Sequence, residues 1–125
     1  MAYDYKSDAE NLKKSLNCRY VGSDIIFLPK VDSTNNLAKE YAKKSNKEGL
    51  VIVADSQSGG RGRTGKSWHS PPETGVYLSV ILKPDIKPEY LSFITLVAGV
   101  SAASTINEFC HRKANLKWPN DVLIN

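Results

Sequence analysis

Leu50-Val-Ile-Val-Ala54 is the clearest β-strand signal in the sequence. Every position is apolar, a pattern typical of a strand that is buried on both faces in the middle of a sheet. A second strong strand is predicted at 76–82, and further strands at 24–28, 116–118 and 122–124. Pro119-Asn-Asp121 separates the last two strands and is typical of a hairpin turn.

Two helices are predicted in the first third of the chain. Ser7 or Asp8 is expected to cap a short helix with Leu12 and Leu16 on its apolar face. The residues at 33–35 are expected to cap a second helix that ends near Lys44. Its expected buried positions are Leu37, Ala38, Tyr41 and Ala42.

The longest helix is predicted from Tyr90 to about Arg112. Its expected core-facing positions are Ile94, Val97, Val100 and Ile106. Together with the strands, this order predicts one domain of the α+β (mixed α/β) class.

The composition is that of an ordinary globular domain. The 125 residues are 41% hydrophobic and 24% charged, and a chain of this length has room for one core. Lys and Arg total 17 against 13 acids, so the net charge of +4 suits an anionic partner but falls short of a typical nucleic-acid binder. Two cysteines provide neither a disulfide framework nor metal-ligand spacing.

We expect a cytoplasmic protein without a membrane span. No apolar signal segment opens the sequence. The longest apolar stretch, 94–106, is interrupted by Ser and Thr and is too short to cross a bilayer.

The segment 55–75 is a long Gly-rich and basic connection, and such loops are usually functional or disordered. Within it, Gly60-Arg-Gly-Arg-Thr-Gly-Lys-Ser67 matches the P-loop pattern. A P-loop needs a helix to begin at its Lys and Ser, whereas Trp68-His-Ser-Pro-Pro follows here. The match is therefore interpreted as a false positive.

The glycines and the cations Arg61, Arg63 and Lys66 are still suited to holding an anion such as a phosphate. A solvated basic loop without a ligand is an equally good interpretation from composition alone. Insertion of Arg-Gly-Arg into a DNA minor groove is disfavoured, because only three basic residues cluster and no proline holds the triplet extended.

Taken together, the motifs resemble the biotin–protein ligase family, specifically the first part of its catalytic domain. The matching pieces follow one another in order: Val31-Asp-Ser-Thr-Asn35, Gln57, Gly60-Arg-Gly-Arg63, Trp68-His-Ser-Pro71, Gly75-Val-Tyr-Leu-Ser79 and Lys117-Trp-Pro-Asn-Asp121. The pattern of the Gly-rich segment separates the chain from the related lipoate ligases.

The resemblance implies a fold related to class II aminoacyl-tRNA synthetases and an ATP-dependent ligase reaction. Biotin and MgATP would give biotinyl-AMP, and biotin would then pass to a lysine of a biotin carboxyl carrier domain of an acyl-CoA carboxylase. The implied cofactors are ATP and Mg²⁺, and a homodimer is compatible with the family.

The resemblance also implies roles for individual residues. The implied biotin-binding residues are Ser33, Thr34, Asn35, Gln57, Arg61, Gly62 and Arg63. The implied ATP- and adenylate-binding residues are Gly60, Arg61, Arg63, Trp68, Lys117 and Asn120. The implied catalytic residues are Arg63, Lys117 and Asp121, with Asp121 helping to hold magnesium or to orient groups at the adenylate.

Simpler interpretations remain open for several of these residues. Ser33 is also a plain helix cap, and Trp68 could anchor the loop as a hydrophobic plug. Lys117 and Asp121 could be an edge-strand cation and a turn-stabilising carboxylate, and Trp118 is expected in the core. His69 and His111 have no acid or nucleophile in a recognisable arrangement, so neither is offered as a catalytic base.

The expected organisation is a helical lead-in at 1–23 and a partial catalytic domain at 24–125. The lead-in is too short for the winged helix-turn-helix of family members that act as repressors, so DNA binding is not expected. The family's next segment, of Lys-Leu-Ala-Gly-Ile type with an essential lysine, and its small C-terminal domain are not in the sequence. The alternative is therefore a truncated fragment that binds biotin or adenylate without catalysis; a P-loop protein, a nucleic-acid binder or a lipoate ligase is less favoured.

Overall fold

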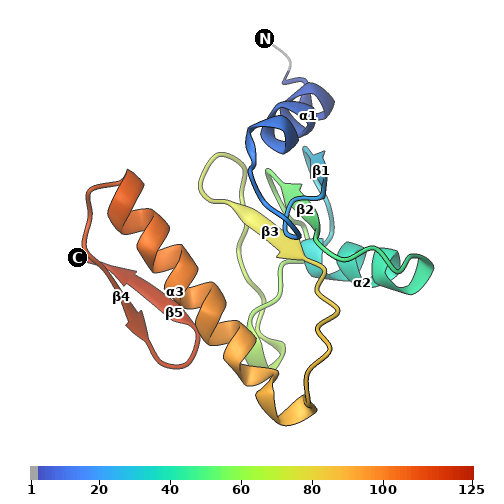
Figure 1. Cartoon of the computed structure of the whole chain (residues 1–125). Helices are drawn as coiled ribbons and strands as arrows, with labels where there is room; N and C mark the ends of the chain where they lie inside the picture. Colours follow the sequence, from blue (N-terminus) through green and yellow to red (C-terminus); the bar gives the residue numbers. More distant parts are fainter. Residues whose placement is uncertain (1–2) are drawn as a thin grey trace. The chain divides into compact units, whose positions relative to one another are not determined.

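The computed structural model describes residues 3–125, which divide into two compact units between Lys83 and Pro84 (Figure 1). Both units combine helix and sheet, so the predicted mixed class is confirmed.

The first unit is built on a three-stranded sheet. Its strands are β1 (Asp24–Leu28), β2 (Leu50–Ala54) and β3 (Tyr77–Val80), in the order β1-β2-β3 (Figure 1). β2 pairs parallel with β1 and antiparallel with β3. The prediction that Leu50–Ala54 is the central strand is confirmed.

Helix α2 (Thr34–Lys44) covers one face of this sheet. Its Ala38 joins Leu50, Ile52 and Ile81 in the buried core, and Ile26 packs against them. Ser33 caps the helix as predicted, because its Oγ accepts the backbone N–H of Asn36 at 3.4 Å. The expected burial of Tyr41 is wrong, because the residue is 39% exposed.

Helix α1 (Tyr5–Ser15) lies on the opposite face, since Phe27 points away from its neighbour Ile26 and meets Tyr5 edge-to-face at 5.0 Å. Its cap is Asp4, whose carboxylate accepts the N–H of Ser7 at 3.1 Å, not Ser7 or Asp8. Leu12 and Leu16 remain exposed, contrary to expectation.

The long connection 55–75 is pinned at several points. Isolated bridges join Gln57 to both Val31 and Ser70, and Arg61 to Ser67. A short 3₁₀ turn, η1 (Arg63–Gly65), ends at Lys66 in extended backbone. No helix begins at Lys66 or Ser67, so the P-loop interpretation is rejected.

The second unit is a helix packed on a hairpin. A 3₁₀ turn, η2 (Pro88–Tyr90), leads into α3 (Ser92–Phe109). Strands β4 (Ala114–Lys117) and β5 (Asp121–Ile124) then form the predicted antiparallel hairpin. Asn107 joins helix to hairpin, because its Oδ1 accepts the N–H of Ala114 at 2.7 Å.

The predicted core face of α3 is only partly correct. Ile94 and Ile106 are half-buried, but Val97 and Val100 are 64% and 52% exposed. The buried position of the helix is Ala103, which was not predicted. The continuous helical segment Pro88–Phe109 has 22 residues, longer than the apolar stretch read from the sequence. By length and composition alone it could cross a membrane, a test that core helices of soluble proteins also pass.

Candidate functional site

The beginning of α2 gathers most of the predicted biotin-binding side chains. Gln57 approaches from the loop, and its Oε1 accepts the backbone N–H of Thr34 at 2.8 Å and the Thr34 hydroxyl at 3.2 Å. Ser79 approaches from β3, and its hydroxyl donates to Thr34 Oγ1 at 2.9 Å and to Asn35 Oδ1 at 2.8 Å. Ser33, Thr34 and Ser79 are buried, whereas Asn35 is exposed.

The same hydrogen-bonded group extends into the basic loop. The Gln57 side-chain N–H donates to Ser70 Oγ at 3.1 Å, and Ser70 donates to the Trp68 carbonyl at 3.2 Å. We call the residues Thr34, Asn35, Gln57, Ser70 and Ser79 the amide network. It connects the helix cap, the sheet and the loop through polar contacts alone.

Ser70 and Ser79 were not among the predicted site residues. One signal for Ser79 was present: it lies two residues before Ile81, so it shares that residue's buried face of the strand. Ser70 carries no comparable local signal, because its burial depends on Gln57 thirteen residues earlier.

Gly60 lies against the amide network. A Cβ at this position would come within 2.5 Å of the Trp68 carbonyl oxygen and 2.7 Å of Ser70 Oγ. Only glycine lets the loop pass this close, and the Gly60 carbonyl accepts the Trp68 N–H at 2.8 Å. The predicted site residue Gly60 thus supports the site through its backbone.

The loop beyond Gly60 presents its cations outward. The Gly62 N–H donates to the Lys66 carbonyl at 2.7 Å, which closes a tight turn around Arg63. Arg61, Arg63 and Lys66 are exposed. Trp68 is 62% exposed, so it does not act as a hydrophobic plug.

Asp32 adds a carboxylate immediately before the cap of α2. The hydrogen bond from the Asn36 side-chain amide, 2.9 Å long, is the largest cause that lowers the pKa of Asp32. The positive charge of Arg61 contributes a smaller effect in the same direction. The carboxylate is therefore held ionised beside the basic loop.

The remaining predicted residues, Lys117, Asn120 and Asp121, belong to the second unit. They line a cavity of about 140 Å³ between residues 95–99 of α3 and the hairpin turn. Asn120 donates a side-chain hydrogen bond of 3.1 Å to the Asp121 carboxylate. Trp118 is 74% exposed, so its expected place in the core is wrong.

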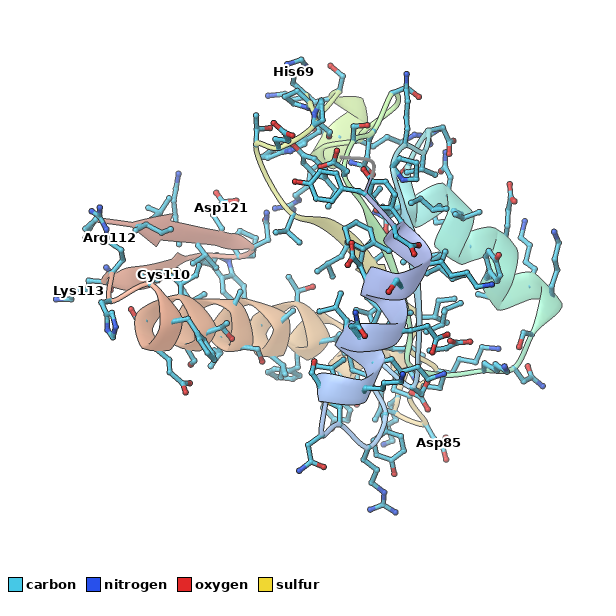
Figure 2. The ribbon with its side chains drawn as sticks, turned by 90° about the horizontal axis from the view of Figure 1, so that it is seen from above. His69, Asp85, Cys110, Arg112, Lys113 and Asp121 are labelled. Atoms are coloured by element: carbon cyan, nitrogen blue, oxygen red, sulfur yellow. The ribbon has the colours of Figure 1, made fainter. Side chains whose placement is uncertain are left out.

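Figure 2 shows where three charged side chains of the α3–hairpin unit lie. Asp121 lies at the turn of the hairpin, whereas Arg112 and Lys113 lie at the opposite end, near Cys110. In the first unit, His69 lies on the outside of the loop and is exposed.

No group of three or more His, Cys, Asp or Glu side chains that could hold a metal lies within residues 3–125. Magnesium is commonly held by one or two carboxylates together with the phosphates of a nucleotide. Asp121, exposed beside the cavity, is compatible with that kind of site.

Comparison with known proteins decides the family. A model of the biotin/lipoate A/B protein ligase family matches residues 27–125. The chain belongs to this family. Among its relatives is the bifunctional ligase/repressor BirA of Bacillus subtilis, 37% identical over 96% of this chain. The biotin–[acetyl-CoA-carboxylase] ligase of Mycobacterium tuberculosis is 31% identical over 73% of it.

Solved structures place the fold among the biotin protein ligases. The Aquifex aeolicus enzyme in complex with biotin and ATP superposes on 78% of this chain with a TM-score of 0.69 and 40% identity. The Leishmania major enzyme in complex with biotinyl-5-AMP superposes on 86% with a TM-score of 0.72 and 26% identity. The present chain spans 37% of the length of the Bacillus relative and 40% of the length of the Aquifex chain.

Proposed function

We propose that the chain is part of the catalytic domain of an ATP-dependent biotin–protein ligase. The observation that carries the proposal is the amide network beside the basic loop. It places amide groups suited to a neutral polar ring next to cations suited to phosphates. Relatives with biotin, ATP or biotinyl-AMP bound support the same reading.

The proposed reaction has two steps. A carboxylate oxygen of biotin attacks the α-phosphorus of ATP, and the bond to pyrophosphate breaks to give biotinyl-AMP. The amine of an acceptor lysine then attacks the biotinyl carbonyl, an amide bond forms, and AMP leaves while the amine loses a proton. The first step brings two anions together, so fixed cations must offset their repulsion.

The first unit would bind biotin and steady the adenylate. Asn35 and Gln57, with Ser33 and Thr34, would recognise the ureido ring. Arg61 and Arg63 would lie along the phosphate together with the backbone of Gly60, on the turn that the Gly62 N–H closes. The ring of Trp68 would fold over the adenine or the biotin. The amide groups of Asn35 and Gln57 are held by hydrogen bonds at the start of α2, and the Arg61 and Arg63 side chains are exposed.

The second unit would contribute at the triphosphate. Lys117 would offer a cation and Asn120 a donor, while Asp121 would take part in holding Mg²⁺. That ion supplies charge neutralisation at the phosphates.

The proposed acceptor is a lysine of a biotin carboxyl carrier domain, and the proposed compartment is the cytoplasm, where carboxylases work. DNA is not a proposed partner, because the cations exposed on the basic loop are few.

The test is a mass-spectrometric assay for biotinyl-AMP after incubation of the chain with biotin and MgATP. Arg63→Ala is expected to abolish retention of the adenylate without changing the circular dichroism spectrum. Arg19→Ala is the matched control, because Arg19 stacks on Tyr20 outside the loop. Equal amounts of biotinyl-AMP from both variants would show that Arg63 has no role in the reaction.

A second candidate is binding without catalysis. It is favoured by the amide network, because the side chains suited to biotin hydrogen-bond to one another within the first unit alone. Calorimetric titration with biotin distinguishes the two functions: heat of binding from a folded chain that forms no adenylate supports this second candidate.

A further inference from the structure

Asn35 is exposed, yet one end of its carboxamide is fixed from inside the molecule. Its Oδ1 accepts a hydrogen bond of 2.8 Å from the hydroxyl of Ser79, a residue of β3 that is only 7% exposed. A carboxamide has an acceptor at one end and two donors at the other. Holding the oxygen inward therefore turns the NH₂ group outward, to the surface.

Gln57 is fixed at both ends of its carboxamide. Its Oε1 faces the helix cap, where it accepts the Thr34 N–H at 2.8 Å, and one of its amide hydrogens reaches Ser70 Oγ at 3.1 Å. Ser70 is 3% exposed. Both amide oxygens thus accept hydrogen bonds from within the protein, two at Gln57 Oε1 and one at Asn35 Oδ1, and the outward-facing NH₂ group of the pair is that of Asn35.

The Ser79 hydroxyl has one proton for two acceptors, Asn35 Oδ1 and Thr34 Oγ1. Thr34 is also held by Gln57, whereas the Asn35 amide has no other hydrogen bond among those that the structure records for the described residues. Loss of the Ser79 hydroxyl would therefore free Asn35 more than it would disturb Thr34.

We infer that Ser79 is a positioning residue that holds Asn35 with its NH₂ group outward, so that the site meets an acceptor oxygen of its ligand with amide donors. The inference rests on the proposed function for the identity of the ligand, in which the acceptor is the ureido oxygen of biotin. The same arrangement disfavours a ligand that presents a cationic donor at that position.

The first measurement needs no ligand. In ¹⁵N NMR spectra of the chain, the side-chain NH₂ of Asn35 is expected to be ordered, and Ser79→Ala is expected to make it mobile. Ser79→Thr, which keeps a hydroxyl, should restore the order. Ser56→Ala is the matched control, since Ser56 donates a similar bond of 3.0 Å to the Pro29 carbonyl elsewhere in the unit. Unchanged order of Asn35 in Ser79→Ala would overturn the inference.

The second measurement compares biotin with 2-iminobiotin, in which a protonated imine replaces the ureido oxygen. In Ser79→Ala the ratio of the affinities for biotin and 2-iminobiotin is expected to fall about tenfold, which is the effect of one hydrogen bond. In Ser56→Ala the ratio should not change. If Ser79→Ala does not fold, Asn35→Asp decides: its outward oxygen should shift the preference to 2-iminobiotin, and an unchanged preference would overturn the inference. If the chain binds neither compound, the proposed function fails, while the order of Asn35 still decides the role of Ser79.

Discussion

The carbonyl oxygen of Tyr20 occupies the space into which a side chain on Gly49 would extend: an ideal Cβ on Gly49 would lie 1.8 Å from it. Gly49 also has a φ of +84° and donates its N–H to the Ile81 carbonyl at 2.8 Å, while its own carbonyl accepts the Gly22 N–H at 2.8 Å. This one residue ties the turn before β1 to the entrance of β2 and to the end of the β3 segment.

Gly49→Ala is therefore expected to destabilise the first unit by more than about 4 kcal/mol, because backbone atoms must move to admit the methyl group. Gly65→Ala is the matched comparison. Gly65 also has a positive φ, +76°, but nothing lies within 4 Å of its added Cβ, so only the conformational cost of about 1–2 kcal/mol applies. Urea unfolding of the two variants measures the difference, and equal midpoints would contradict the steric argument.

The cap of α2 gives a second prediction. Ser33→Ala removes the acceptor for the Asn36 N–H and should lower the free energy of unfolding by about 1 kcal/mol. Ser101→Ala, at an exposed position of α3, should change it by less than about 0.5 kcal/mol. Urea denaturation followed at resonances of α2 and of α3 is the measurement, so that each variant is observed in its own unit. A Ser33 variant as stable as the native chain would show that the cap contributes nothing.

In the second unit, Asn107 holds the start of the hairpin. Asn107→Ala leaves the N–H of the buried Ala114 without its 2.7 Å acceptor, a loss of about 1–3 kcal/mol. The Ala114 amide should then exchange its hydrogen at least about tenfold faster. Asn107→Asp retains an acceptor oxygen and should keep most of the protection; fast exchange in both variants would assign the effect to the amide nitrogen instead.

The pKa of Asp32 provides a prediction about pH. Because the folded state lowers this pKa, the carboxylate stabilises the fold above its ordinary pKa, and this contribution is lost as the pH falls through the lowered value. Asn36→Ala removes the largest cause and should move the pKa of Asp32 up toward its ordinary value. NMR titration of the Asp32 carboxyl carbon measures it, with Asn11→Ala in α1 as a control that should leave the titration unchanged.

Local sequence signals were sufficient where one residue or one pattern determines the structure. The uniformly apolar stretch Leu50–Ala54 identified the central strand, and Ser33 identified the start of α2. They were insufficient where several residues could fill the same position. Asp4, Ser7 and Asp8 are all of types that can cap a helix, and the structure shows that Asp4 does so, because its carboxylate accepts the Ser7 N–H. In α3 apolar residues occur on all sides, so periodicity could not show which of them are buried.

Contacts between segments distant in the sequence could not be predicted, for a different reason. Asn35 and Ser79 are separated by 44 positions, and their hydrogen bond exists only because β3 pairs beside the strand that α2 covers. The resemblance to the family identified residues of the candidate site. The spacing of residues in the sequence cannot predict which way the carboxamide of Asn35 faces.

The close passage of Gly60 has an evolutionary consequence. Since a methyl group there would displace both Ser70 and the Trp68 carbonyl, and would come within 3.1 Å of the Gln57 amide nitrogen, positions 57, 60 and 70 cannot drift independently. Across natural homologues, a residue larger than glycine at 60 should coincide with changes at 57 or 70. The three positions should thus be inherited as one co-varying set, and lineages that lose one member should lose the others soon after.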